Sequence, residues 1–314
     1  MKTVYYEKYG SPDVLQLREI PEPEPGEKEM LVKVAATTVT AGALLARKGA
    51  HPDSRFFTVM LRLFFGLFRP RKNITGYEFS GIVEKIGSRV SAFRPGDAVF
   101  GTNTGLPSGA YAEYICVPEK WKQGVVAGKP EYLSFSEAAA LPVGAMAALQ
   151  ILRKAGIQKG QKVLIYGASG SVGTYALQIA GSLGARVWGV CSTENIELVK
   201  SLGAHGVIDY KKENFTETCR DFDVVFDAVA KISRSSCKAV LKERGTFISI
   251  KSPTSETDEK LNTILELCRR GELKPFIDRE YPLEQTAEAH RYADTGHKRG
   301  NVVITVSSLP ADRT

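Results

Sequence analysis

Residues 162–184 constrain the fold of this chain more than any other segment. Lys162–Tyr166 is an apolar, β-branched run typical of a buried strand, and it leads directly into a turn that holds three glycines. Behind the turn, apolar residues recur with helical spacing until Gly184, where we expect the helix to end. The segment therefore predicts a strand, a tight turn and a helix, which is the repeating unit of a parallel α/β sheet.

Glycines in this turn favour binding of the pyrophosphate of a dinucleotide. They allow a tight bend, a close approach of the backbone to the phosphates, and close packing of the helix on the strand. The helix N-terminus adds free N–H groups and the positive end of the helix dipole. The alternative is a turn with a structural role only. The residues that we expect at the phosphates are Gly167, Ala168, Ser169, Gly170, Ser171, Val172 and Gly173.

The end of the next strand indicates which dinucleotide is bound. An NAD site places an acidic residue about 20 positions after the glycine turn, where it holds the ribose hydroxyls. Here Ser192 and Thr193 follow the strand expected over 186–190, and they offer hydroxyl groups without negative charge, which favours NADPH. Glu194 can take the acidic role if that strand ends later. Ser192 and Thr193 can also simply cap a helix over 195–202.

The spacing of the apolar runs along the sequence predicts two domains. Up to residue 124, short β-branched runs alternate with Gly and Pro turns, as in a β-rich barrel or sandwich. From residue 125 onward, strands alternate with helical segments, and a late helix over 261–270 precedes a last strand over 300–306. The other expected strands cover 31–34, 81–86, 98–100 and 112–117, and then 163–166, 187–191, 206–208, 224–226 and 246–250.

Composition excludes several classes of protein. A length of 314 residues suits about two domains. The 42 Lys and Arg residues are scattered among 35 Asp and Glu residues without a run of like charge, so nucleic-acid binding is not expected. Five cysteines, an odd number without a CxxC pair, indicate a reducing cytoplasm rather than a disulfide framework or a structural zinc. The chain begins without an apolar stretch of signal-peptide length, so we do not expect secretion.

The apolar stretch at 56–68 allows three interpretations. It contains Arg62 and is shorter than the about 20 apolar residues that cross a bilayer. Its spacing is helical but leaves little polar face, so the leading interpretation is a buried helix or a flap over a pocket. An oligomer contact is the second. The third is a helix on a membrane surface, which the flanking Arg55, Arg69, Arg71 and Lys72 would support.

Short motifs are distributed along nearly the whole chain. Five of them are 76–83 (GYEFSGIV), 93–101 (FRPGDAVFG), 109–114 (GAYAEY), 167–173 (GASGSVG) and 299–303 (RGNVV). Others lie at 138–142, 202–204, 207–210, 281–283 and 287–291. Together and in this order they resemble the zinc-independent quinone oxidoreductase branch, which includes zeta-crystallin, of the medium-chain dehydrogenase/reductase superfamily. The resemblance implies a GroES-like catalytic domain at 1–124 and 271–314 and a doubly wound Rossmann NADP-binding domain at 125–270. It also implies an active site in the cleft between the two domains.

The resemblance also assigns roles to single residues. Metal-dependent relatives hold zinc with Cys and His, but the Cys position lies within 38–41, and Tyr77 replaces the His, so no catalytic zinc is expected. Tyr77 is then expected to face the nicotinamide, and Thr40 to donate a hydrogen bond to the nicotinamide or the substrate. Quinone reductases of this branch often carry Asn and Asp near Thr40, and both are absent from 39–43 here. The family match places Tyr210 and Arg299 near the adenosine 2′-phosphate, although either can be a packing or solvent residue.

These observations predict an enzyme that transfers hydride from NADPH to a small electrophilic acceptor, a quinone or an α,β-unsaturated carbonyl. The alternatives are an enoyl-thioester or ketone reductase of the same fold, and a non-catalytic NADPH-binding redox sensor. The family implies a homodimer, because the strand at 246–250 would otherwise be an exposed apolar edge. We expect Cys191 to be a small buried residue. None of the four histidines has metal-ligand spacing, and we expect all of them at the surface or between domains: His51, His205, His290 and His297.

Overall fold

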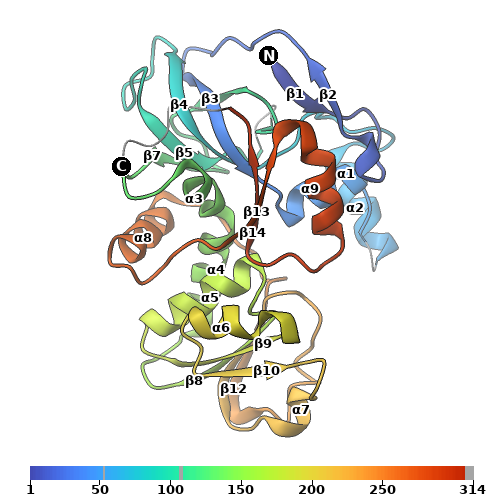
Figure 1. Ribbon diagram of the computed structural model, residues 1–314, viewed down its shortest axis with the longest axis vertical. Coiled ribbons are helices and arrows are strands. Elements are labelled where there is room, and N and C mark those ends of the chain that lie inside the picture. Colours follow the sequence, from blue (N-terminus) through green and yellow to red (C-terminus); the bar gives the residue numbers. More distant parts are fainter. Residues whose placement is uncertain (52–53, 106–108, 308–314) are drawn as a thin grey trace. The chain divides into compact units, whose positions relative to one another are not determined.

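The computed structural model describes residues 1–51, 54–105 and 109–307, and the chain forms two compact units (Figure 1). The first unit comprises residues 1–142 together with the chain from residue 277 onward, and the second comprises Val143–Phe276. The division expected from the sequence lies at 124/125 and 270/271. Residues 125–142 therefore belong to the first unit of the structure, and residues 271–276 belong to the second.

The second unit is built on a five-stranded parallel sheet with the strand order β10-β9-β8-β11-β12. The chain starts in the middle at β8, moves outward to β10, and then crosses back to add β11 and β12 on the other side. This reversal is the predicted doubly wound topology, and ligands of such sheets bind at the carboxyl ends of the strands beside the reversal. The strands are β8 (Lys162–Tyr166), β9 (Arg186–Cys191), β10 (Gly206–Asp209), β11 (Phe222–Asp227) and β12 (Leu241–Ser249).

Helices connect β8 to β9, β9 to β10 and β10 to β11, as is usual for crossovers between parallel strands. The predicted helix behind the glycine turn is α5 (Ser171–Ser182), and the helix expected over 261–270 is α8 (Asp258–Arg269). A 3₁₀ turn η2 (Thr193–Asn195) precedes α6 (Ile196–Ser201), so the helix expected over 195–202 begins with a tighter turn. The remaining helices of this part of the chain are α4 (Pro142–Ala155), which starts at the border between the units, and α7 (Phe215–Thr218).

The first unit contains a largely antiparallel seven-stranded sheet that the C-terminal segment completes. Its strands follow the order β13-β14-β3-β4-β5-β7, and β6 also pairs with β3. The late strand expected over 300–306 is β14, and it pairs antiparallel with β3 near Thr37. The strands are β3 (Glu29–Thr38), β4 (Glu78–Ile86), β5 (Ala98–Thr102), β6 (Tyr114–Pro118), β7 (Val126–Gly128), β13 (Ile277–Pro282) and β14 (Asn301–Thr305), with a separate pair β1 (Lys2–Tyr5) and β2 (Gln16–Glu19).

Apolar runs of both sheets form the two cores. In β8, Val163, Leu164 and Ile165 are fully buried, and in β3 Met30 and Val32 are fully buried as well. The helices of the first unit are α1 (Ala41–Lys48), α2 (Arg55–Phe65), α3 (Phe135–Ala140) and α9 (Thr286–Asp294), and the 3₁₀ turns are η1 (Pro12–Val14) and η3 (Leu283–Gln285). All five cysteines are free thiols. None of the helices in the described parts of the chain is long and apolar enough to cross a membrane.

The segment at 56–68 is a helix, but the interpretation of it as a buried helix is wrong. It forms α2 and the turn that follows, and no residue of α2 is buried. Phe56, Phe64 and Phe68 are 70%, 72% and 87% exposed. Its apolar residues therefore point outward from the unit that carries them. A flap over a pocket, the other part of the leading interpretation, stays a prediction. The oligomer contact and the membrane-surface helix both need such an exposed face.

His290 corrects a second expectation, because it lies in the core of the first unit and not at a surface. The Tyr111 hydroxyl donates to the carbonyl oxygen of Thr38 (3.1 Å) and lies 3.0 Å from His290 Nε2, so His290 must donate from that nitrogen. His290 Nδ1 is buried and has no hydrogen-bond partner among the described residues. Burial, followed by the charge of Arg47, lowers the pKa of His290 to about 3. The ring is therefore neutral in the folded protein.

We predict that His290 makes the protein less stable in mild acid. The folded-state pKa of about 3 lies below the ordinary value of 6.5, so the unfolded chain binds a proton first as the pH falls. The free energy of unfolding should therefore decrease as the pH is lowered from about 6.5 toward about 3. Urea unfolding at several pH values measures this dependence. The His290→Gln variant should show a flatter dependence, and the exposed control His297→Gln should match the wild type; equal curves for His290→Gln and wild type would contradict the prediction.

Candidate functional site

The glycine turn after β8 has the geometry that the sequence predicts. Gly167 has a φ of +80°, in the left-handed region that glycine adopts without strain. Its N–H and that of Ala168 both donate to the carbonyl oxygen of Val190, at 3.0 and 3.1 Å. These two bonds fasten the turn to the end of β9. The turn therefore lies at the carboxyl edge of the sheet, where dinucleotides bind in this topology.

The third glycine of the turn lets α5 pack directly against it. A Cβ atom at Gly173 would lie 2.1 Å from the carbonyl oxygen of Gly167, so any side chain there would push the helix away. Gly170 is the N-cap residue and has no side chain to occupy the first N–H groups of α5. These N–H groups and the positive end of the helix dipole suit an anion such as a pyrophosphate.

A cluster of polar side chains joins the turn to the end of β9. Asn195 Nδ2 donates to the hydroxyl oxygens of Ser192 (3.0 Å) and Ser169 (3.2 Å). Asn195 Oδ1 is buried and has no hydrogen-bond partner among the described residues, so it is an acceptor that a ligand donor can satisfy. The sequence predicted Ser169 and Ser192 as cofactor residues, and the structure places them together. Asn195 was missed because we considered it only as the start of a helix.

Thr193 lies beside the same strand end but already has an anionic partner. Its hydroxyl donates to Asp209 Oδ2 at 2.6 Å, and Lys212 Nζ lies 3.9 Å from the same oxygen. Asp209 ends β10, and the backbone N–H of Lys211 donates to its other oxygen. Sequence reasoning missed three residues close to the predicted Tyr210: Asp209, Lys211 and Lys212. Tyr210 is 47% exposed and its N–H is held by the carbonyl oxygen of Cys191.

Glu194, the residue that could have supplied an acid to the ribose, is paired elsewhere. Lys211 Nζ lies 2.5 Å from Glu194 Oε1. The hydrogen bond from Lys211, a backbone hydrogen bond and one from the Ser192 hydroxyl lower the pKa of Glu194 to about 2. The buried thiol of Cys191 has a pKa raised to about 11, mainly by burial. Cys191 is thus inert and fills space under the site, as expected.

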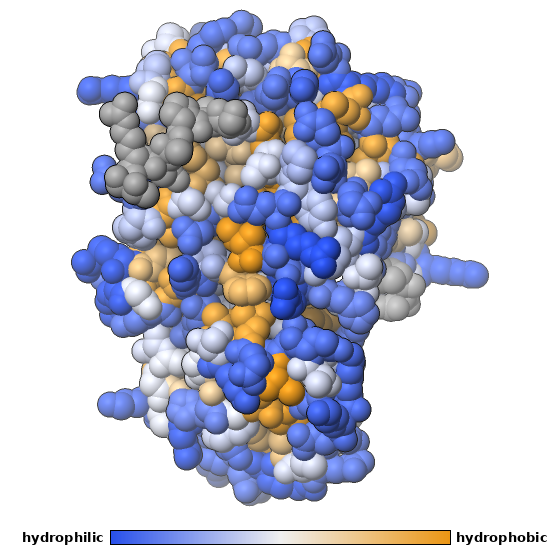
Figure 2. All heavy atoms as spheres, viewed as in Figure 1, coloured by the Kyte–Doolittle hydropathy of each residue, from blue (hydrophilic) through white to orange (hydrophobic). Residues whose placement is uncertain are grey.

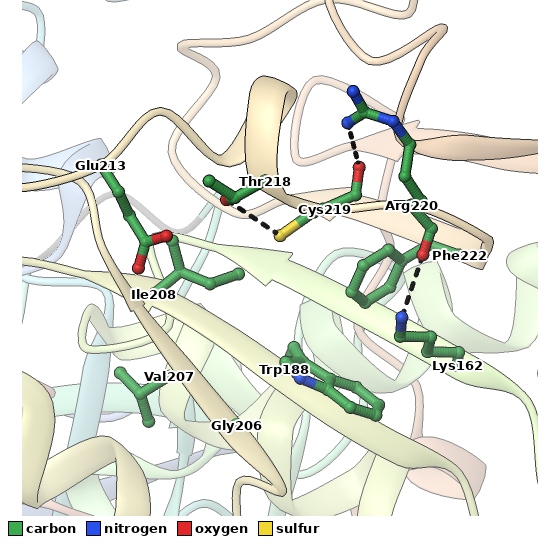
Figure 3. Close-up of a pocket in the computed structure, with 10 residues that line it drawn as sticks. All are labelled: Lys162, Trp188, Gly206, Val207, Ile208, Glu213, Thr218, Cys219, Arg220 and Phe222. Carbon is green, nitrogen blue, oxygen red and sulfur yellow. Dashed lines mark hydrogen bonds between the residues drawn. The ribbon is translucent and has the colours of Figure 1, made fainter.

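A pocket of about 250 Å³ in the second unit lies at the wrong edge of the sheet for the cofactor (Figure 3). Lys162, Gly206 and Phe222, which line it, are the first residues of β8, β10 and β11. Lys162 Nζ donates to the carbonyl oxygen of Arg220 at 2.9 Å and lies over the ring of Phe222 (Figure 3). Since the dinucleotide binds at the carboxyl ends of the strands, this pocket is not its site.

In the first unit, Thr40 and Tyr77 both lie close to Gly42. Thr40 is the N-cap residue of α1, and its hydroxyl oxygen accepts from the N–H of Ala43 at 3.1 Å. A Cβ atom at Gly42 would lie 3.3 Å from the ring of Tyr77 and 3.7 Å from Thr40 Oγ1. The structure therefore brings the two predicted catalytic side chains together. The Thr40 oxygen is already an acceptor, so its hydroxyl proton can be donated.

The phenol of Tyr77 is a very weak acid. Burial, opposed by a hydrogen bond with Thr75, raises its pKa to about 12. The phenol therefore keeps its proton throughout the physiological range and can donate a hydrogen bond. Its neighbour Glu78 is buried and accepts a hydrogen bond from the Thr38 hydroxyl, which keeps the acid away from solvent.

The Arg299 side chain is paired with a carboxylate of the first unit. Its Nε donates to Asp278 Oδ1 at 3.0 Å, and its backbone N–H donates to the other oxygen of the same carboxylate at 2.9 Å. The Asp278 side chain is fully buried in this pair. Arg299 is therefore engaged with Asp278, and its predicted contact with the 2′-phosphate stays a prediction.

Models of known families match both units. The model described as "Alcohol dehydrogenase GroES-like domain" matches residues 26–129, and two described as "Zinc-binding dehydrogenase" match residues 171–273 and 251–304. The "2-methylene-furan-3-one reductase" of Solanum lycopersicum is 34% identical to this chain over 97% of the chain and 79% of the relative. This chain belongs to the medium-chain dehydrogenase/reductase superfamily, in its quinone oxidoreductase branch.

Further relatives agree with the superfamily assignment and confirm the resemblance found in the motif strings. The chloroplastic "NADPH-dependent alkenal/one oxidoreductase" of Arabidopsis thaliana is 32% identical, over 97% of this chain and 79% of the relative. Among solved structures, the quinone oxidoreductase from Coxiella burnetii has a TM-score of 0.86 at 31% identity, covering 98% of this chain and 99% of that chain. The GroES-like and Rossmann fold predicted for this superfamily member is confirmed.

Metal ligands do not converge in the described parts of this superfamily member. Within residues 1–51, 54–105 and 109–307, no three His, Cys, Asp or Glu side chains come together in a way that could hold a metal ion. The resemblance would place zinc ligands within 38–41 and at Tyr77, and neither place holds a Cys or a His. The absence of catalytic zinc stays a prediction for metal analysis to check.

We predict that a negative charge at Ser192 selectively weakens binding of NADPH. The Ser192→Asp variant would place a carboxylate where we expect the 2′-phosphate, while NADH has only a hydroxyl there. We expect the ratio of NADPH to NADH affinity to fall by about tenfold or more. Titration of protein fluorescence with each cofactor measures the ratio. The matched variant Ser192→Ala should change it much less, and an unchanged ratio in Ser192→Asp would remove Ser192 from the cofactor site.

We predict that Tyr77 acts through a hydrogen bond and not by giving up its proton. Its raised pKa makes it a weak acid, but Tyr77→Phe removes the hydrogen bond to the developing negative charge, so kcat should fall by about tenfold or more at saturating NADPH. The pH profile of kcat between 6 and 10 should keep its shape, because a group with a pKa of about 12 does not titrate there. A loss of about threefold or less would remove Tyr77 from the catalytic site, and disappearance of an alkaline limb would instead identify it as the general acid.

Proposed function

We propose that this chain is a zinc-independent oxidoreductase that uses NADPH to reduce a quinone or an α,β-unsaturated carbonyl compound. The observation that carries the proposal is the polar cluster at the carboxyl edge of the second unit. There the open N-terminus of α5, Ser169, Ser192 and the unsatisfied Asn195 oxygen meet, and the acidic side chains already have partners. The relatives named for reduction of alkenals, enones and quinones support the acceptor class.

The groups at this edge of the sheet suit the phosphates of NADPH. The turn offers α5 N–H groups to the pyrophosphate, and Ser192 already donates to the anionic oxygen of Glu194, a role that a phosphate oxygen can take over. Lys211 and Lys212 supply positive charge beside Tyr210. When bound, NADPH supplies the hydride. Each of these contacts binds or orients the cofactor.

Thr40 and Tyr77 provide the hydrogen bonds that the reduction needs. Hydride addition to the β-carbon of an enone leaves negative charge on the carbonyl oxygen, and a donor near that oxygen stabilises the charge. The Thr40 proton and the Tyr77 phenol proton are both suited to this task, because neither group ionises near neutral pH. Water then supplies the proton to the α-carbon, which completes the reduction. A metal is not needed for an acceptor that is already electron-poor.

A panel of acceptors with NADPH tests the proposal. NADPH oxidation is followed at constant enzyme with quinones, enones, saturated ketones and enoyl thioesters, each with and without a chelator. We expect turnover of quinones or enones that the chelator does not change, and a protein that contains no stoichiometric zinc. Turnover only of enoyl thioesters or ketones would establish the alternative substrate classes. Tight NADPH binding without turnover of any acceptor would indicate a redox sensor.

We also propose that the protein forms a homodimer in the cytoplasm. The outer side of β12 supports the homodimer, since β12 lies at the end of the parallel sheet and, among the strands that the structure describes, pairs only with β11. A second copy placed along β12 would continue the sheet and satisfy its backbone groups. The five free cysteines support a reducing compartment. A monomer in sedimentation at micromolar concentration would exclude the homodimer.

A further inference from the structure

The segment 55–72, which we name the α2 segment, carries a continuous exposed apolar surface. Elsewhere in the described residues, large exposed apolar side chains are scattered over separate elements, such as Leu17 and Leu183. Much of the molecular face drawn in Figure 2 is hydrophilic, with apolar residues showing among the hydrophilic ones. In the α2 segment eight apolar side chains are between 50% and 87% exposed: Phe56, Phe57, Val59, Met60, Leu63, Phe64, Leu67 and Phe68.

The helix α2 contacts its own unit through a narrow face that holds Thr58 and Arg62 together with the half-buried Leu61 and Phe65, and its other apolar residues lie outside this face. The Thr58 hydroxyl oxygen accepts from the backbone N–H of His51 at 2.9 Å. Arg62 Nε donates to the carbonyl oxygen of Gly49, the C-cap of α1, at 2.6 Å, and its guanidinium lies over the ring of Tyr9. Tyr9 in turn donates from its hydroxyl to Gly66 at the end of α2. The exposed apolar face therefore points outward because the narrow face holds the helix in place.

The α2 segment and its surroundings are strongly basic. Residues 54–77 contain five Arg and Lys residues and no Asp or Glu. Arg69 and Arg71 line a pocket of about 690 Å³ together with Tyr5, Glu7, Pro70 and Asn73. Glu7, its one carboxylate, is paired with Arg18 at 2.9 Å, so the two arginines dominate the charge of the pocket. The apolar face thus has a basic pocket at its C-terminal end.

We propose that the α2 segment binds the surface of membranes that contain anionic phospholipids. The outward aromatic and aliphatic side chains would enter the boundary between head groups and acyl chains, with α2 lying in the plane of the membrane. Arg55, Arg69, Arg71 and Lys72 would contact the lipid phosphates, and the pocket at Arg69 and Arg71 would take a head group. The eleven residues of α2 are too few to span a bilayer, so the contact is peripheral.

Charge favours the membrane over a second copy of this chain. A twofold contact between two α2 segments would bring the cations that flank α2 in one copy, Arg55, Arg69, Arg71 and Lys72, toward those of the other, with no acidic residue from 54 to 77 on either side. Such a contact would have to bury like charges against each other. An anionic membrane offers both partners that the segment lacks, an apolar layer and negative charge.

Vesicle binding tests the proposal without depending on the proposed enzyme activity. Purified full-length protein is co-sedimented with vesicles of phosphatidylcholine alone and of phosphatidylcholine and phosphatidylglycerol in about a three-to-one ratio. We expect binding to the anionic vesicles that is about tenfold or more tighter than to the neutral ones. The binding should weaken as salt is raised from about 0.1 M to about 0.5 M, because salt screens exposed charges.

Two variants separate the apolar and the charged contributions. The double variant Phe57→Ser/Phe64→Ser should lose anionic-vesicle binding by about tenfold or more, because two inserting rings are removed. The double variant Arg69→Gln/Arg71→Gln should bind both kinds of vesicle nearly equally. The matched control Leu17→Ser/Leu183→Ser removes two exposed apolar side chains elsewhere and should bind like the wild type. Circular dichroism and NADPH binding establish that each variant is folded.

A tryptophan at position 64 reports insertion directly. The emission of Phe64→Trp should shift to shorter wavelength with anionic vesicles and be quenched by brominated lipids, whereas the wild type should change little. The proposal would be overturned if wild-type protein bound neither kind of vesicle, or bound neutral and anionic vesicles equally. An unchanged Phe57→Ser/Phe64→Ser variant would overturn it as well. If that variant instead loses self-association in sedimentation while no form binds vesicles, a second copy is the partner of the α2 segment.

Discussion

One steric contact, between the helix α5 and the turn that precedes it, determines the geometry of the nucleotide-binding unit. A Cβ atom at Gly173 would lie 2.1 Å from the Gly167 carbonyl oxygen, so the helix can approach the strand this closely only through a glycine. Because of this approach, α5 begins at Ser171 beside the end of β8. The turn is also held to β9 through Val190, which brings Ser169 within reach of Asn195. The polar cluster therefore depends on a contact that involves only backbone atoms.

The charges around this cluster are balanced before any ligand arrives. Glu194 pairs with Lys211, and Asp209 accepts from Thr193 and lies near Lys212. An acid that already has its hydrogen-bond donors and a cation nearby repels a phosphate less than an isolated acid would. Two acidic residues close to the proposed 2′-phosphate position are thus compatible with the proposed use of NADPH. Their partners come from β10 and the turn after it, and not from the strand that carries Ser192.

In the first unit, a charged side chain is buried and a group of aromatic side chains is exposed, which composition alone would not predict. Arg47 is fully buried, and it is stabilised by Asp294 at 2.5 Å and by the carbonyl oxygen of Gly10. A buried charge persists only when it is paired in this way. In contrast, α2 leaves its aromatic residues exposed, because Thr58 and Arg62 occupy the contacts with the rest of the unit. Arginine is therefore a buried core residue in α1, as Arg47, whereas in α2 Arg62 holds the helix on the unit.

The sequence by itself determined the strand, glycine turn and helix at 162–184, the parallel sheet and the superfamily, because periodicity, glycine geometry and motif order are properties of neighbouring residues. It also predicted Ser169 and Ser192 as cofactor residues, because they lie just after strands. Only the tertiary structure revealed the bond from Asn195 to Ser169, the pairing of Thr193 with Asp209 and of Arg299 with Asp278, the burial of His290 and the outward face of α2. Each of these depends on residues that are distant in the chain and meet only after the elements pack, so no local pattern could specify them.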